Sequence, residues 1–535
     1  MKGNNNNSRN FFDSAGFYII ILTIINLMNF MDRGIIPGAT EEFTHFIDNT
    51  INTNTPSLYI GLLQSSFIIG ISLASPFFAT LAHRSSPFLL VYYGMLCWTV
   101  AATISGTAFY FKSFEVLLIG RVLSGVGESS FQCCIPPWIA INSNEKTKSV
   151  WLAIFNTAIP VGTALGYVYS SVISTSIGWQ WTFFIESILM LPFLIFLGFI
   201  KSRFPYVKPG VRHFIPVNER DEEEIVPVLI PNNDNDNEII IRLSLNENEQ
   251  ENEATFPLIQ KTKEEDIYLD ERPPPNIIEE IHTICQYPCY LYICAGYAAQ
   301  TGALIGLSTF GSAFLMGLGY FDSEVEASSY FGAVVSIAGI LGYPLGGLIL
   351  DFFSTRSKSL RGHTHAELIR ATIMMIITST LGFIIFLSTY WIRSKLLFIF
   401  VLFIGCLFLF LCNSAITISI LLSVPIEHRA LAIAFCSILI HAFGDVPSPL
   451  LVGFLKDDLA PGCTGDDDSV STSDACRDEA NGLRFTMLLV SLWFAWCILF
   501  FTMSFIHAKR DYRAEKTRRP SLYLDPETNK IEKQK

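Results

Sequence analysis

The sequence predicts an all-α protein with twelve transmembrane helices in two six-helix bundles. Of its 535 residues, 50% are hydrophobic and only 16% are charged. Mostly apolar runs of roughly 20 residues or more, the length that crosses about 30 Å of hydrocarbon, recur along the chain. A long polar insert after the sixth run divides the runs into two blocks of six. These three observations exclude a water-soluble fold.

The first block contains six expected spans, and its first span does not have the small-residue cleavage pattern of a signal peptide. The spans are 17–38, 57–81, 87–110, 114–140, 148–174 and 180–200. The second block contains 287–317, 327–351, 366–391, 395–424, 429–455 and 483–507. The expected domains are therefore an N-terminal segment 1–16, a bundle 17–203, a linker 204–285, a bundle 286–508 and a basic tail 509–535.

The linker carries the acidity of the chain. Residues 219–280 hold 19 Asp or Glu and 5 Lys or Arg, whereas the whole chain has a net charge of −12. Stretches such as ERDEEE and NENEQENE have too little hydrophobicity to form a core, so most of 204–285 is expected to be disordered. A short helix near 276–285 is expected to lead into the seventh span.

The distribution of Lys and Arg near the span ends predicts that both termini and the linker are cytosolic. The opposite loops are poorer in basic residues, and the loop 39–57 has none. The residues that set this orientation are Arg84, Lys146, Lys148, Lys201, Arg203, Arg356, Lys358 and Arg361, together with the tail KRDYRAEKTRR at 509–519.

Cys463 and Cys476 flank an acidic loop on the non-cytosolic side, where disulfides persist. A bond that closes so short a loop contributes about 3 kcal/mol. A disulfide is the favoured interpretation, and two free thiols in a mobile loop are the alternative.

Motifs for ATP binding, metal binding and nucleophilic catalysis are missing from the sequence. There is no GxxxxGK[ST], no metal-spaced Cys/His cluster and no nucleophile elbow. We therefore expect neither an enzyme nor a cofactor, and any transport would have to use an ion gradient.

Loop and span motifs resemble known transporters. GGLILDFFSTR, 346–356, is similar to the cytosolic loop motif of the major facilitator superfamily, which implies a gating loop with Gly347, Asp351 and Arg356. INLMNFMDR at 25–33, LLIGRVLSGVGESS at 117–130, QTGALIGL at 300–307 and HAFGDVPSP at 441–449 resemble the Spinster family of that superfamily. The resemblance implies a major facilitator fold and transport of lysophospholipids or sphingosine-type lipids.

Arg121 and Glu128 lie two helical turns apart on one face of the fourth span. Each charge costs about 2.5 to 3.5 kcal/mol at the centre of a bilayer, so both side chains are expected to face the bundle interior. Glu128 is interpreted as a proton carrier and Arg121 as its regulator or a contact for a substrate anion, as the resemblance also implies. A static buried pair is the alternative.

Asp32 and Arg33 end the first span. The resemblance implies a functional Asp at this place, so Asp32 is expected to be a second titratable carboxylate near Arg121, with Arg33 as a substrate contact. The alternative places both residues at the level of the lipid headgroups.

The second block offers further candidate substrate contacts. His441 and Asp445 lie one turn apart, and His441 suits a sensor of an acidic lumen, or the two form a neutral pair that positions a bend. Gln300 and Thr301 offer hydrogen bonds to a headgroup, or serve helix packing. Phe67, Phe155, Tyr297, Phe310 and Phe331 could line an acyl-chain path, although lipid-facing filler is the default interpretation in a chain with 44 Phe.

The prediction is a proton-coupled secondary active transporter of an amphipathic lipid, in the lysosomal, endosomal or plasma membrane. Its partners would be the substrate and protons, without nucleic acid, and it is expected to be a monomer. One alternative is a transporter of a small organic anion or sugar. The other is a non-transporting receptor or scaffold that recruits partners through the linker.

Overall fold

The computed structural model describes residues 15–82, 85–143, 148–201, 228–229, 241–242, 277–356, 364–425, 428–464, 476 and 479–518. Most of the N-terminal segment and of the linker, and the end of the tail, lie outside the described residues. So do several basic residues used above for orientation, namely Arg84, Lys146, Arg203, Lys358 and Arg361.

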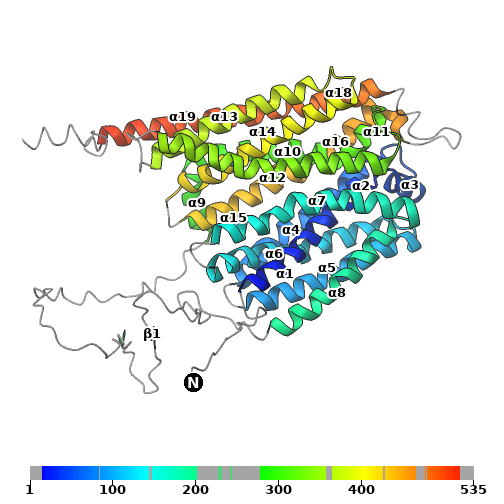
Figure 1. Cartoon of the computed structure of the whole chain (residues 1–535), viewed down its shortest axis with the longest axis horizontal. Coiled ribbons are helices and arrows are strands. Elements are labelled where there is room, and N and C mark those ends of the chain that lie inside the picture. The colour runs from blue at the N-terminus through cyan, green and yellow to red at the C-terminus, as the bar shows by residue number, and fades with distance from the viewer. Residues whose placement is uncertain are drawn as a thin grey trace, which may run out of the picture. The chain divides into compact units, whose positions relative to one another are not determined.

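Six long helices build the N-terminal bundle (Figure 1). They are α1 (Ala15–Arg33), α4 (Pro56–Ala82), α5 (Pro87–Phe111), α6 (Phe114–Asn142), α7 (Lys148–Ile177) and α8 (Gln180–Ile200). Two short helices, α2 (Ile35–Gly38) and α3 (Thr40–Ile51), connect α1 to α4.

The C-terminal bundle is built in the same way. Its helices are α10 (Pro288–Thr309), α11 (Gly311–Gly317), α12 (Glu324–Arg356), α13 (Thr364–Ser388), α14 (Lys395–Leu422), α15 (Arg429–Ile440), the π-helix η4 (His441–Asp445), α16 (Pro447–Leu459), the 3-10 helix η5 (Pro461–Thr464), α18 (Ala480–Leu492) and α19 (Phe494–Arg518). The short helix expected before the seventh span is α9 (Ile277–Cys285). Two-residue strands β1 (Val228–Leu229) and β2 (Ile241–Arg242) pair antiparallel.

Within the described residues, ten helical segments are long and apolar enough to cross a membrane. The two expected spans outside this set are α6, which contains Arg121 and Glu128, and α10. Each of the twelve expected spans thus coincides with a long helix or with consecutive helical segments.

The first span ends earlier than predicted. The range 17–38 was expected to be one helix, but α1 ends at Arg33 and the chain turns at Gly34 into α2. A Cβ atom at Gly34 would lie 2.6 Å from the backbone oxygen of Thr163. The close approach of α7 therefore requires glycine at this turn.

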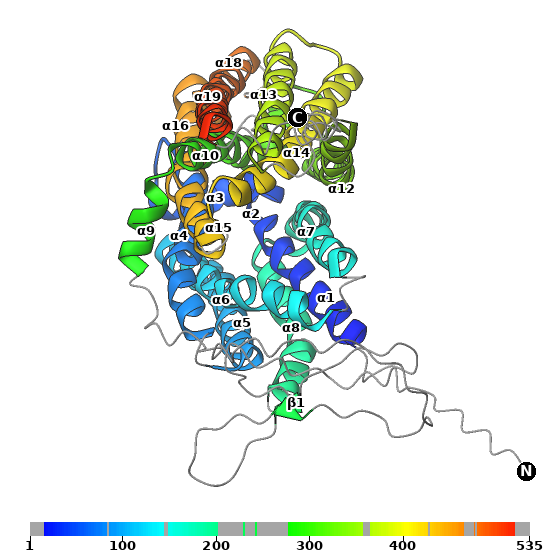
Figure 2. The ribbon, with the colours of Figure 1, turned by 90° about the vertical axis from the view of Figure 1, so that its left-hand side faces the viewer.

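The two bundles belong to one compact unit, Met1–Val211 with Ile277–Lys535, and residues 212–276 form a second unit. Within the first unit, α4 packs on α16 and α7 packs on α12, which joins the bundles along two seams. In Figure 2 the blue and cyan helices of the N-terminal bundle and the green to red helices of the C-terminal bundle form separate groups.

Hydrogen bonds join the bundles near α2, α3 and α11, which we call the α3 end. Ser312 donates to the backbone oxygen of Pro37 at 2.7 Å, and Ser328 donates to that of Gly38 at 3.2 Å. Tyr167 of α7 donates to the backbone oxygen of Ser308 at 2.8 Å. The bundles are therefore closed against each other at this end.

Candidate functional site

An ion pair between α1 and α6 lies inside the N-terminal bundle. Arg121 Nη1 donates to Asp32 Oδ1 at 2.6 Å, and both side chains are 0% exposed. Asp32 is therefore enclosed by protein on all sides. A pair with this burial is strongly favoured to stay intact while both groups are charged, because separating them leaves uncompensated buried charge.

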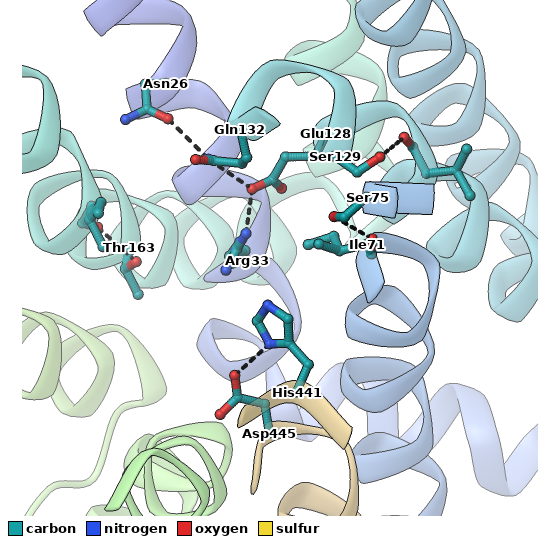
Figure 3. Close-up of polar contacts among 12 residues, drawn as sticks. Asn26, Arg33, Ile71, Ser75, Glu128, Ser129, Gln132, Thr163, His441 and Asp445 are labelled. Carbon is teal, nitrogen blue, oxygen red and sulfur yellow. Dashed lines mark hydrogen bonds and ion pairs between the residues drawn. The ribbon is translucent and has the colours of Figure 1, made fainter. Parts of the chain in front are cut away.

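A second pair joins the same two helices. Arg33 Nη2 donates to Glu128 Oε1, and Arg33 remains 25% exposed whereas Glu128 is fully buried. Gln132 Nε2 donates to the same carboxylate at 3.3 Å and to Asn26 Oδ1 at 3.2 Å. Figure 3 shows this chain of contacts from Asn26 to Arg33. Glu128 is thus bonded to the amide of Gln132 on one side and to the partly exposed Arg33 on the other.

Phe67 of α4 separates the two arginines. Its ring centroid lies 4.6 Å from Arg121 Cζ and 5.4 Å from Arg33 Cζ. The helix α6 can approach so closely because Gly125 leaves no Cβ, which would lie 2.0 Å from the backbone oxygen of Phe67. This ring provides a cation–π partner for each guanidinium.

Sequence reasoning placed the right residues together but paired them differently. Arg121 was expected to hold Glu128 and Asp32 together, and the structure instead assigns Arg121 to Asp32 and Arg33 to Glu128. The two-turn spacing of Arg121 and Glu128 separates them along α6 by about 10 Å. Each is therefore bonded to a different residue of the MDR segment of α1.

The default interpretation of the aromatic candidates as lipid-facing filler is wrong for most of them. Four of these side chains are between 0% and 6% exposed, and Tyr297 is partly buried. The four are Phe67, Phe155, Phe310 and Phe331.

His441 and Asp445 belong to the C-terminal bundle and face the arginine pairs of the N-terminal bundle. His441 Nδ1 and Asp445 Oδ2 lie 2.8 Å apart, with 25% and 11% of the side chains exposed. They begin and end the π-helix η4, in which Val446 N donates to the backbone oxygen of His441. In Figure 3 the imidazole projects toward Arg33. A π-helix at this place fits the frequent use of such segments at functional sites.

Gln300 and Thr301 lie deeper in the C-terminal bundle. Gln300 is 1% exposed, and its Nε2 donates to Asn413 Oδ1 at 3.0 Å and to the backbone oxygen of Leu409 at 3.1 Å. Thr301 donates to the backbone oxygen of Tyr297 at 3.1 Å. Both residues thus bond within the C-terminal bundle, and the structure does not bring them to the two arginine pairs.

The expected gating loop is the last part of α12 rather than a loop. A Cβ at Gly347 would meet nothing within 4 Å, and the close helix contact is made by Gly346, whose Cβ would lie 2.5 Å from the backbone oxygen of Leu411. Asp351 is exposed, and Arg356 is the last residue of α12.

Cys463 and Cys476 are joined by a disulfide with a Cα–Cα distance of 4.3 Å. Both cysteines line a pocket at the α3 end, with His45 and Glu41 of α3 and Lys456 of α16. The bond therefore links η5 to Cys476 beside this pocket.

Three polar residues of the site were not identified from the sequence. Asn26 and Gln132 extend the Glu128 pair, and Glu186 of α8 is 0% exposed. The sequence did contain a signal for Glu186, because placing a charged acid within an apolar span costs free energy there just as it does for Glu128. Among the described residues, no group of three or more His, Cys, Asp or Glu side chains is placed to hold a metal ion.

Comparison with known proteins identifies the family. The sequence profile of the Major Facilitator Superfamily matches residues 22–449. A probable sphingolipid transporter of Arabidopsis thaliana, spinster homolog 2, is 29% identical over 456 residues, which cover 82% of this chain and 80% of the relative. Protein spinster homolog 1 of Homo sapiens is 26% identical over 461 residues, with 83% and 74% covered. A sphingosine-1-phosphate transporter of Danio rerio is 25% identical over 459 residues, with 82% and 75% covered.

The fold has a solved counterpart. The inward-facing, unoccupied crystal structure of a bacterial homologue of the human lysosomal transporter Spinster matches with a TM-score of 0.64 and 17% identity, covering 93% of this chain and 98% of the other. This confirms the predicted major facilitator fold. The chain belongs to the Major Facilitator Superfamily of membrane transporters and is similar to its Spinster members.

Proposed function

We propose that the protein is a proton-coupled secondary active transporter of an amphipathic lipid with an anionic headgroup, such as a lysophospholipid or a phosphorylated sphingosine-type lipid. It works by alternating access of the two bundles. The observation that carries this proposal is the Arg33–Glu128 pair, in which a fully buried carboxylate is bonded to a partly exposed arginine.

The carboxylate of Glu128 and an anionic substrate would compete for Arg33. Protonation of Glu128 removes the negative charge that holds the guanidinium, and Arg33 becomes available to an anion. His441 and Asp445 are bonded to each other, and the imidazole of His441 projects toward Arg33 (Figure 3). An occupied Arg33 and a neutral Glu128 then favour a different relative position of the bundles from the one described here.

The lipid class is supported by two observations. The relatives from Arabidopsis thaliana and Danio rerio are named as sphingolipid and sphingosine-1-phosphate transporters. Phe30 and Phe67 lie beside Arg33, with ring centroids 4.5 Å and 5.4 Å from its Cζ. A cation with aromatic rings around it suits a molecule that has a charged head and an apolar chain.

The proposed orientation places the α3 end and the disulfide on the non-cytosolic side and both termini in the cytosol. Closure at the α3 end then corresponds to an inward-facing transporter. We propose a lysosomal, endosomal or plasma membrane location and a monomeric protein.

The decisive experiment measures flux in proteoliposomes under an imposed pH gradient. Wild type should move sphingosine-1-phosphate or lysophosphatidylcholine, and Glu128→Gln should lose the response to the gradient while its melting temperature stays close to that of wild type. Glu115→Gln, which changes an exposed acid on the same helix, is the matched control and should transport normally.

Unchanged pH-driven flux in Glu128→Gln would contradict proton coupling through Glu128. A parallel assay with a hexose and a small dicarboxylate decides the cargo class, because uptake of these without lipid flux would replace the lipid proposal.

A further inference from the structure

Glu186 is a buried acid without a partner. It lies on α8, its side chain is 0% exposed, and neither carboxyl oxygen has a hydrogen-bond partner in the part of the chain that the structure describes. An isolated buried carboxylate would cost several kcal/mol, so a group in this position is stable only when it is neutral or has a cation to bind.

The charged groups around Glu186 come from two other helices. Asp32 of α1 and Arg121 and Glu128 of α6 act on it electrostatically. Glu186 is the only charged residue in the sequence of α8, and α5, which packs on α8, contains none. From α7, Tyr169 lies close by and donates its hydroxyl to the backbone oxygen of Thr182 at 2.6 Å, one turn before Glu186.

The charges of this cluster do not balance. Asp32, Glu128 and Glu186 supply three carboxyl groups, and Arg33 and Arg121 supply two guanidinium groups. The two hydrogen-bonded pairs use one acid and one arginine each, so the third acid has no cation left. A neutral cluster therefore contains one proton, and Glu186 is the acid that no guanidinium contacts.

Arg121 has unused donors. Its Nε and Nη2 atoms are buried and have no hydrogen-bond partner among the described residues, and only Nη1 bonds to Asp32. A guanidinium can present its donors to two different carboxylates. Arg121 can therefore exchange one acid for another without leaving its site.

We propose that Glu186 is a third proton-carrying acid of the N-terminal bundle and the alternative partner of Arg121. In the conformation described here the proton resides on Glu186 and Arg121 binds Asp32. When Asp32 takes up a proton, an O–H bond forms on Asp32, the O–H bond of Glu186 breaks and its proton leaves, and the guanidinium bonds to the new carboxylate. The charge of the cluster is zero before and after the exchange.

This proposal rests on the proposed function and deepens it, because it adds Glu186 to Asp32 and Glu128 as an acid that can carry a proton. Its test, however, requires no transport. Difference infrared spectroscopy of the full-length protein in lipid nanodiscs reports the carbonyl stretch of protonated carboxyl groups. Relative to wild type, Glu186→Gln should lose one such band.

The variant Asp32→Asn distinguishes the exchange from a static neutral acid. The amide imitates protonated Asp32 and frees Arg121, so the band assigned to Glu186 should be lost here too, although Glu186 is still present. Glu115→Gln, an exposed acid of α6, should leave the spectrum unchanged.

Persistence of the band in Glu186→Gln would mean that the proton is elsewhere, and persistence in Asp32→Asn would mean that Arg121 does not change partners. Either result overturns the proposal. If both variants show these spectral losses but the wild-type protein moves no lipid, the result contradicts the proposed function alone.

Discussion

Arg121 and Arg33 each bind one buried acid, but the two arginine side chains differ in how far they are exposed. Arg121 is 0% exposed and Arg33 is 25% exposed. Both guanidinium groups lie within 6 Å of the Phe67 ring, a contact worth about 0.5 to 2 kcal/mol each. Arg33 is thus the more accessible of the two, which fits its proposed role as a substrate contact, and the burial of Arg121 fits its proposed role in proton coupling.

Substitution of Arg121 separates a coupling role from a structural one. Arg121→Lys should lose most of the transport, because lysine lacks the planar fork that can exchange between carboxylates. Arg121→Ala leaves Asp32 buried without its cation, which costs about 3 to 5 kcal/mol, and should lower the melting temperature as well.

The double variant Arg121→Ala with Asp32→Asn removes the buried charge again. We expect it to regain thermal stability but not pH-driven flux. Flux that returns together with stability would show that the pair is only structural.

Sequence reasoning identified four of the five charged residues in this cluster. The cost of charge in hydrocarbon and the resemblance of two motifs indicated Asp32, Arg33, Arg121 and Glu128, whereas the pairing depends on the turn at Gly34 and on the rise along α6. Those are properties of three-dimensional packing. Spacing in the sequence cannot supply them.

At the scale of elements, the C-terminal bundle caps two helices of the N-terminal bundle. Glu324 Oε1 of α12 accepts from Glu41 N and from the Thr40 hydroxyl, both at 3.1 Å, at the start of α3. The carboxylate of Asp457 on α16 accepts from Ser57 N at 3.2 Å and Leu58 N at 2.9 Å, at the start of α4. Acids are favoured at helix N-termini, so both contacts stabilise closure of the α3 end.

Removal of either cap should favour opening at the α3 end. A helix cap is worth about 1 kcal/mol, which corresponds to roughly a fivefold change in the population of the open state. Glu324→Ala and Asp457→Ala should each raise the labelling rate of an Ala327→Cys reporter, a buried position at the start of α12, by about this factor. The exposed Glu326→Ala is the control, and an equal increase in that variant would refute the assignment.

Closure should also depend on pH through Glu41. Burial raises the pKa of Glu41, and neighbouring Glu42 raises it further while His45 opposes both. Glu324 and Lys456 face the same region from α12 and α16. The closed state favours the protonated form, so closure is strengthened below the ordinary pKa of a glutamate and weakened as pH rises through the elevated value.

Glu41→Gln should therefore flatten the pH dependence of Ala327→Cys labelling. Rates are corrected with an exposed cysteine measured at each pH, and Glu326→Gln serves as the control. If the variant with both Glu41→Gln and Ala327→Cys has the same pH profile as Ala327→Cys alone, Glu41 does not control closure.

Element positions followed from hydropathy, but irregular elements did not. Runs of apolar residues predict where a helix crosses a membrane. They carry no signal for the break between α1 and α2, for α3, or for η4, whose five residues HAFGD differ from ordinary helix only in their hydrogen bonding. The proline at 447 predicts a bend near this place without predicting its type.

At the scale of the whole molecule, the acidic insert is separable from the transport machinery. Residues 212–276 are assigned to a second unit, whereas the seams α4–α16 and α7–α12 lie within the first unit. The two-bundle arrangement could be predicted from the sequence because the insert divides the spans equally, whereas the face that each bundle presents depends on side-chain packing.

Deletion of 215–275, replaced by a flexible linker long enough to span the gap, should leave lipid flux within about twofold of wild type, because the sequence of the insert is too polar and acidic to form a hydrophobic core. Flux is compared with that of Glu128→Gln measured in the same proteoliposome preparation. Loss of flux in a deletion variant with an unchanged melting temperature would show that the insert takes part in transport.

The hydrogen bonds that Glu324 and Asp457 of the C-terminal bundle accept from the starts of α3 and α4 have a consequence for hydration. When α12 and α16 withdraw, the N–H groups at the starts of α3 and α4 and the carboxylates of Glu324 and Asp457 lose their partners in one movement. Only water can replace these hydrogen bonds at once, so opening must be accompanied by water uptake. Osmotic stress from a solute that is excluded from the protein surface should therefore slow the transport cycle at the opening step.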